Sequence, residues 1–284
     1  MARPLRPDFP GAVHHVTARG NAGNDIFLDD ADRRALLDVF GRVCGDFGWQ
    51  CHAYCLMSNH YHLLIETPEG GLSRGMRHLN GIYTQAFNRA HGRSGHIFRG
   101  RFNSILIDKG AYLLELCRHV VCNPVRARLV RRAREFPWSS YRATVDLDPR
   151  PDWLQTDWIL NQFGSHRRDA IKAFVRYIAE ARPAPHLETE VRDQVFLGSE
   201  AFVAEAKMRV AGRATPRRAP RTQPRKPPRR LAAYAAEWPE RDPAIVAAYR
   251  SNDHTQQAIA KHFGLHDTTV CRIIEKARAQ EPNR

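Results

Sequence analysis

The chain has 284 residues, 43% hydrophobic and 26% charged, which is enough for one sizeable core and a small second domain. Lys and Arg number 44 against 30 Asp and Glu, so the formal net charge is +14 and favours a polyanionic partner, with nucleic acid first. No apolar run of about 18 residues and no signal-peptide core are present, which argues against a membrane protein and predicts a cytoplasmic one. Six cysteines without a C-x-x-C pair exclude a zinc ribbon and a disulfide framework.

Apolar patterning over the first 122 residues predicts strands alternating with helices. The expected strands lie at 11–20, at 49–56, at 60–66 after a turn at Asn59, and at 97–107 with a bend at Gly100. The expected helices lie at 31–47, 72–90 and 111–122, the first capped by Asp29 or Asp30 and the last ending near Asn123 because a proline follows. The order strand, helix, strand, strand, helix, strand is that of a ferredoxin-like fold. The expected class is therefore α+β, an antiparallel sheet with packed helices.

Two histidines two residues apart mark the third strand. Alternate side chains of a strand share a face, so His60 and His62 should project together, about 7 Å apart along the backbone. Tyr61, Leu63 and Ile65 fall on the other, apolar face, which leaves the histidines on the wet side. Two imidazoles placed in this way can reach one metal ion. Alone, however, His-x-His is a short pattern that also occurs by chance.

A third ligand is available on the last helix of this region. His119 and Asn123 are four residues apart, about 40° around a helix, so both can lean towards one point beside the sheet. The Asn123 amide oxygen can then join the two histidines.

Basic residues gather around this helix. Residues 97–134 hold nine Lys and Arg against two acidic residues, and such a surplus beside a candidate metal site favours phosphate binding. For any single arginine, a solvated surface charge is the alternative. The DNA-binding candidates are Arg99, Arg101, Arg118, Arg126 and Arg128.

Three segments together resemble the small HUH-superfamily transposases, especially those associated with repetitive extragenic palindromes. They are SNHYHLL at 58–64, RF at 101–102 and RHVVCNPVRA at 118–127. The likeness runs from about Asp8 to Val145 and continues more faintly to about Val210. It implies that two histidines hold Mg²⁺ or Mn²⁺, that a polar side chain of the last helix completes the site, and that a tyrosine of that helix attacks a DNA phosphate. His60 and His62 match the ligands, and Asn123 matches the helix ligand.

The sequence departs from that pattern at the nucleophile, where His119 stands in place of the tyrosine. A histidine can be phosphorylated, or can deprotonate a water and turn strand transfer into hydrolysis. Tyr112, seven residues back on the same helix and about 10 Å along it, and Tyr83 on the preceding helix are the alternative nucleophiles. For each of them, a core or groove position is the competing interpretation.

The remaining chain predicts three further regions after a catalytic domain at 1–145. Residues 146–211 are expected to form a helical extension, with helices near 153–163 and 168–181. Residues 212–230 hold five prolines, seven arginines, one lysine and no acid, which indicates a stiff disordered linker. Residues 231–284 are expected to form a small all-α domain.

The layout of that C-terminal domain indicates a helix-turn-helix. Helices are expected at 242–249, 255–263 and 268–279, the last capped by Asp267, with a turn at 264–265. QQAIAKHFGLHDTTVCRII resembles the recombinase and regulator versions of this motif, which places His266, Thr268, Thr269 and Arg272 towards the major groove of duplex DNA. A plain three-helix bundle is the alternative.

Three functions remain for this sequence. The first, implied by the resemblance, is metal-dependent cleavage and rejoining of single-stranded or hairpin DNA. The second is a domesticated transposase that has lost catalysis with the tyrosine and acts as a DNA-binding or regulatory protein. A metal hydrolase for small substrates fits the histidines but leaves the +14 charge unexplained. Monomer and homodimer are both open.

Overall fold

A computed structural model describes residues 6–180, 191–211, 230–251, 254 and 256–279. The chain divides into two compact units, residues 1–214 and 215–284. Residues 212–229, nearly all of the expected linker, lie outside the described ranges. Within those ranges, no helix has both the length and the apolar character needed to cross a membrane.

The first unit carries a five-stranded sheet in the order β2-β3-β1-β4-β5. The strands are β1 (Ala12–Arg19), β2 (Gln50–Leu56), β3 (His60–Thr67), β4 (Asn103–Ile107) and β5 (Phe196–Leu197). Antiparallel pairing joins the first four strands, and β5 runs parallel to β4. The order of the four antiparallel strands confirms the expected ferredoxin-like arrangement.

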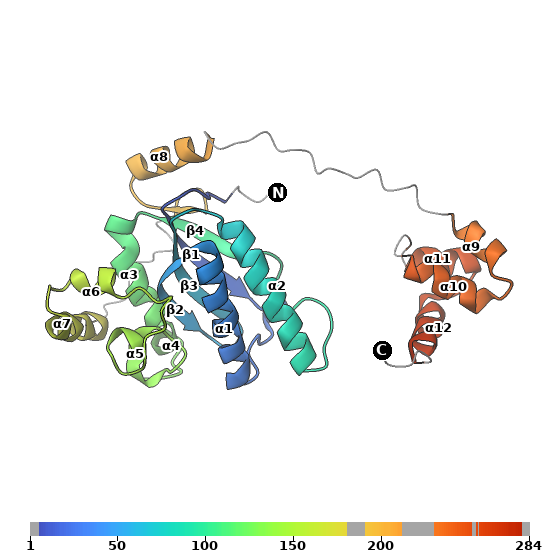
Figure 1. The fold of residues 1–284 in the computed structure, drawn as a ribbon, viewed down its shortest axis with the longest axis horizontal. Coiled ribbons are helices and arrows are strands. Elements are labelled where there is room, and N and C mark those ends of the chain that lie inside the picture. The colour runs from blue at the N-terminus through green and yellow to red at the C-terminus, as the bar shows by residue number, and fades with distance from the viewer. Residues whose placement is uncertain (1–5, 181–190, 212–229, 252–253, 255, 280–284) are drawn as a thin grey trace. The chain divides into compact units, whose positions relative to one another are not determined.

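Helices cover both faces of this sheet (Figure 1). The longer ones are α1 (Asp30–Phe47), α2 (Leu72–Ala90), α3 (Lys109–Val121), α7 (Arg167–Ala179) and α8 (Glu200–Ala211). Short ones are η1 (Asn21–Gly23), α4 (Asn123–Arg126), η2 (Ala133–Glu135), α5 (Tyr141–Thr144) and α6 (Asp157–Asn161). Helices α1 and α2 pack on the face formed by Val16, Tyr61, Leu63 and Ile65. Helices α3, α6 and α7 pack on the opposite face, with Leu64 at its centre.

Local chemistry explains where the helices begin and end. The side chain of Asp29 accepts a hydrogen bond from the Asp32 backbone amide at 2.9 Å, which confirms the predicted cap of α1. Gly48 ends that helix in the left-handed conformation, at φ 62°. At the start of α2 the acceptor comes from far away in sequence, because Asp8 accepts from the Gly71 amide at 2.8 Å. The N-terminal segment is thereby fixed to the sheet.

Two expected boundaries were wrong. Only residues 103–107 of the predicted strand 97–107 form β4, because Gly100 at φ 70° turns the chain and Phe98 makes only an isolated bridge to Gly20. The expected helix at 153–163 forms only over α6. The described residues of 146–180 and 191–211 belong to the first unit, and they also supply β5, which the sequence did not predict. The six cysteines are free thiols, as expected.

The second unit is all helical in its described part. It contains α9 (Leu231–Glu237), α10 (Arg241–Arg250), α11 (Gln256–Phe263) and α12 (Asp267–Ala279). Ile259 of α11 packs with Val270 and Ile274 of α12 in one apolar cluster. Gly264 makes the turn between these two helices at φ 64°. The layout of α11 and α12 is compatible with a helix-turn-helix. Helix α9 was not predicted from the sequence.

Candidate active site

Strand β3 places His60 and His62 together on the face of the sheet that α3 covers. Their ring centroids are 5.0 Å apart. Tyr61, Leu63 and Ile65 point to the opposite core, so the predicted alternation is confirmed. The expectation of a wet histidine face was wrong, since both histidines are only partly accessible and Leu64 beyond them is fully buried.

Two more histidines join this pair. His15, on the neighbouring strand β1, stacks on His62 with 5.2 Å between the centroids and an angle of 12° between the planes. His119, on α3, lies edge-on to both rings, with centroids 6.0 Å from His15 and 6.3 Å from His62. Four imidazoles from three elements therefore meet at one place, and position 119 borders the histidine pair as the sequence predicted.

Hydrogen bonds leave the Nε2 atoms of the pair available. His60 Nδ1 lies 2.7 Å from Asn59 Oδ1. An amide oxygen can only accept, so His60 Nδ1 carries the proton and a neutral His60 has its lone pair on Nε2. His62 Nδ1 lies 3.0 Å from His15 Nε2, whereas His62 Nε2 is buried and has no hydrogen-bond partner among the described residues. A buried nitrogen without a partner is a position where a ligand is expected.

Burial keeps these histidines neutral. It lowers the pKa of His15 to about 3, with further contributions from His119 and Arg126. It lowers the pKa of His119 to about 4, again with Arg126 nearby. The pKa of His62 is well below its usual range because of burial and the neighbouring imidazoles, and that of His60 is lowered by burial and Arg19. Neutral imidazoles are the form that binds metals and attacks phosphorus.

These side chains line a pocket of about 430 Å³, here called the histidine pocket. Its polar wall consists of His15, Thr17, Arg19, His60, His62, Asn103, His119 and Gln194. Arg19 lies directly opposite His60 in the β1–β3 register and is exposed. The pocket therefore combines neutral nitrogen donors with a cation at its edge, a suitable setting for a phosphate group.

The other expected metal ligand lies outside this wall. Asn123 opens α4, and its amide nitrogen donates to the His119 carbonyl at 3.3 Å. It is not among the residues that line the histidine pocket, so a ligand role for its oxygen stays a prediction. Glu66, on the same strand face, is held by Lys109 at 2.6 Å and His52 at 2.9 Å. In the described part of the chain, no three His, Cys, Asp or Glu side chains form a metal-holding group.

The two alternative tyrosine nucleophiles do not line the histidine pocket. Tyr83 is fully buried in the core between the sheet and α1 and α2, on the side away from the histidines, and its hydroxyl donates to the Ile26 carbonyl. Burial raises its pKa, which disfavours the phenolate. Tyr112 is half-buried and packs on the apolar cluster beneath α3. His119 is thus the one predicted nucleophile at the pocket.

The predicted DNA-binding arginines are spread over a wider surface. Arg99, Arg101, Arg126 and Arg128 are exposed. Arg126 donates to the His119 carbonyl at 2.8 Å and so lies beside the site. Arg118 is half-buried and pairs with Glu115. In the second unit Thr268 and Arg272 are exposed and Thr269 is half-buried.

Sequence reasoning missed His15, Arg19 and Asn103. The signal for His15 was available, since the first strand contains two consecutive histidines and one of them had to share a face with the site. The strand register decides which of the two histidines it is. Thr17 pairs with both His62 and Asn103, and His15 lies two residues before Thr17 on the same face. A single sequence does not fix that register.

Comparisons with known proteins found similarity to transposases. Residues 11–114 match the family model described as "Transposase IS200 like". A Haemophilus influenzae protein assigned as a REP-associated tyrosine transposase is 25% identical over 147 residues, which cover 45% of this chain and 84% of the relative. A solved structure of a REP-associated tyrosine transposase bound to a REP hairpin has a TM-score of 0.45 and 20% identity, over 53% of this chain and 89% of that chain.

The family match covers β1 to the first half of α3, and therefore the strands that carry His15, His60 and His62. In these residues the chain is similar to the IS200-like transposase family.

Proposed function

We propose that the protein binds single-stranded or hairpin DNA through its first unit, and cleaves and rejoins it with the help of Mg²⁺ or Mn²⁺. The observation that carries this proposal is the buried Nε2 of His62, which has no hydrogen-bond partner among the described residues. Its ring centroid lies 5.0 Å from that of His60 in the histidine pocket. The family match supports a DNA-processing role, and the name of the Haemophilus relative supports palindromic repeats, which form hairpins, as the substrate.

The residues present fit a divalent cation in part. His60 and His62 each offer a neutral Nε2, the nitrogen that imidazole ligands commonly use. Nitrogen donors suit Mn²⁺ better than Mg²⁺, which prefers oxygen. Since the described residues form no group of three metal ligands here, the other positions would fall to water and DNA phosphate oxygens. When bound, the cation polarises the scissile phosphoryl group.

We assign to His119 the nucleophile role that the resemblance gives to a tyrosine. The imidazole of His119 is neutral and borders the histidine pair. The backbone carbonyl of His119 accepts a hydrogen bond from Arg126. In the proposed step a ring nitrogen of His119 forms a bond to phosphorus, the bond from phosphorus to one sugar oxygen breaks, and that oxygen takes a proton from water. The phosphorus–nitrogen bond keeps the strand attached, so the reverse reaction rejoins it.

The test is a nicking assay of the full chain on a labelled single-stranded hairpin with Mn²⁺ or Mg²⁺. Wild type should nick the DNA and form an acid-labile covalent adduct, whereas His60→Ala and His62→Ala should lose both. His96→Ala, which removes an exposed histidine outside the pocket, is the matched control and should behave as wild type. If wild type nicks the DNA but forms no adduct, the reaction is hydrolysis and not cleavage with rejoining. If wild type does not nick the DNA, the enzymatic proposal is overturned.

A further inference from the structure

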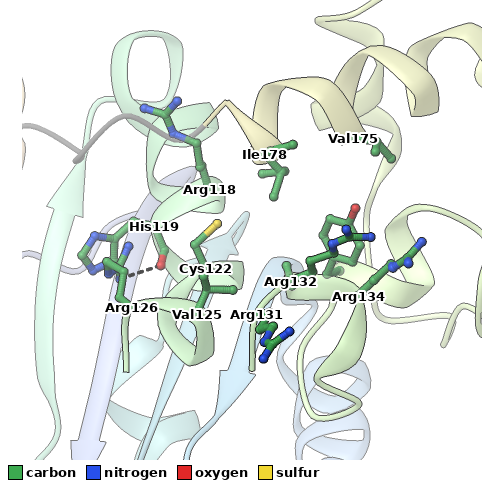
Figure 2. Close-up of a pocket in the computed structure, with 13 residues that line it drawn as sticks. Arg118, His119, Cys122, Val125, Arg126, Arg131, Arg132, Arg134, Val175 and Ile178 are labelled. Atoms are coloured by element: carbon green, nitrogen blue, oxygen red, sulfur yellow. Dashed lines mark hydrogen bonds between the residues drawn. The ribbon is translucent and has the colours of Figure 1, made fainter. Parts of the chain in front are cut away.

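A second and larger pocket adjoins the histidine pocket. It has a volume of about 640 Å³, within the range of about 300–1,000 Å³ that is usual for ligand sites. His119 contributes to the walls of both pockets. Figure 2 shows that α3 and α4 form one side of it, and that Val175 and Ile178 of α7 face them across the opening. A strand of DNA at His119 can thus continue into this second pocket, here called the arginine pocket.

The wall of the arginine pocket is strongly basic. Five arginines line it, Arg118, Arg126, Arg131, Arg132 and Arg134, and no acidic residue does. In the described chain no carboxylate pairs with the last three side chains, which are all exposed. This concentration of positive charge is complementary to a polyanion.

Arg118 is fixed by its neighbours, and one of its N–H donors has no partner among the described residues. Arg118 stacks on the Tyr177 ring, with Cζ 4.6 Å from its centroid, and pairs with Glu115. The Tyr177 hydroxyl also donates to Glu115, at 2.8 Å. Both carboxylate oxygens of Glu115 therefore accept a hydrogen bond, one from Arg118 and one from Tyr177. Arg118 Nε is nonetheless buried and has no partner among the described residues. Such a preorganised guanidinium with a free N–H suits a phosphate oxygen.

The floor of the same pocket is apolar. Val125, Ala133, Ile178 and Tyr141 form it, and Tyr141 is only 5% exposed. Val175 is 37% exposed at the rim. Cys122 adds an uncharged surface, since burial raises the pKa of its thiol. A site for phosphate alone would not need this surface, whereas the face of a nucleobase does.

We propose that the arginine pocket holds one nucleotide of single-stranded DNA, next to the phosphate that lies in the histidine pocket. The base rests on the apolar floor and the arginines bind the phosphates on either side of it. This assignment rests on the proposed function, because it takes the DNA strand to pass His119. It adds a binding subsite that is independent of cleavage.

Binding without a cation tests this subsite separately from catalysis. We would measure the affinity of the full chain, in EDTA, for a fluorescent hairpin with a single-stranded overhang, and replace each overhang nucleotide in turn by an abasic one. Wild type should lose affinity by about tenfold at one position, as is usual for the loss of one stacked base. Val175→Glu places a carboxylate at the exposed rim, where it should not disturb folding, and should abolish the dependence on that position. Met208→Glu, at a more exposed apolar residue of α8 outside the pocket, is the control.

The outcomes separate the two proposals. If wild type binds the overhang but no abasic position changes affinity, or if Val175→Glu keeps the same dependence, the subsite is overturned while nicking can still be observed. Arg131→Ala and Arg132→Ala should each weaken binding and make it less sensitive to salt, in contrast to Arg34→Ala, an exposed arginine of α1. If wild type does not bind the overhang at all, both proposals fail.

Discussion

His15 Nε2 lies 3.0 Å from His62 Nδ1, and the two rings are nearly parallel. Both imidazoles are neutral, so one nitrogen donates and the other accepts. If His62 Nδ1 donates, the lone pair of His62 is on Nε2, the buried nitrogen that has no partner in the described part of the chain. Metal-binding histidines usually donate their other ring N–H in this manner, which fixes the tautomer. His15 would then position a ligand without touching the metal.

Replacing His15 should therefore weaken cation binding without removing a ligand. His15→Leu should raise the Kd for Mn²⁺ by about 10- to 100-fold. His15→Gln should recover part of this loss, because its amide oxygen can accept from His62 Nδ1. Mn²⁺ titration followed by electron paramagnetic resonance measures the effect. His14→Leu, one residue away on the opposite face of β1, is the control, and equal losses in both variants would refute the positioning role.

The packing of α2 on Trp49 makes a prediction about stability. A Cβ atom added at Gly75 would lie 2.3 Å from the Trp49 ring, whereas one at Gly81 on the same helix would meet nothing within 4 Å. Gly75→Ala should cost about 1–3 kcal/mol of unfolding free energy through overpacking. Gly81→Ala should stabilise by up to about 1 kcal/mol through helix propensity. Urea unfolding of both variants checks this, and similar effects at the two positions would show that the contact with Trp49 is wrong.

The buried His14 predicts a loss of stability in acid. Burial lowers its pKa to about 4, an effect that Asp8 partly opposes, and its Nε2 has no partner among the described residues. Between pH 6.5 and about 4, His14 is protonated in the unfolded chain but not in the folded chain. The neutral, buried His14 therefore costs no stability above pH 6.5, and the free energy of unfolding falls as the pH drops from 6.5 to about 4. The loss is at most about 1.4 kcal/mol per pH unit. In His14→Leu the unfolding free energy should fall less steeply over this range, and an unchanged slope would contradict the assignment.

Much of this architecture could be predicted from one sequence. The period-two and period-3.6 patterns gave the four central strands and the three helices around them, including α2 to the residue. They also gave the shared face of His60 and His62, because side-chain alternation in a strand is a local property.

What the sequence did not give depends on contacts between distant segments. The two-residue strand β5 is defined only by its pairing with β4. His15 joins the site through the β1–β3 register, and the arginine pocket needs α7 to lie against α3. The dry environment of the histidines likewise comes from α3, which follows them by some fifty residues.

The second unit predicts a separate duplex-binding activity. Arg272 is exposed near the start of α12, the helix that would enter the major groove if α11 and α12 form a helix-turn-helix. Arg272→Ala should weaken binding of the cognate duplex by about 5- to 100-fold if it contacts a base. Affinity for the single-stranded overhang should not change. Lys261→Ala on α11 is the control for the loss of one positive charge. If both variants lose the same amount of duplex affinity, Arg272 contributes only nonspecific electrostatic attraction.

The most direct test of the account compares wild type with His119→Tyr in the nicking assay with Mn²⁺. If neutral His119 serves at the cleavage site, wild type cleaves the single-stranded hairpin and forms a phosphorus–nitrogen adduct that acid releases. If only His119→Tyr cleaves the DNA, the native chain is the inactive form, and the central claim that the histidine pocket is a working active site is contradicted.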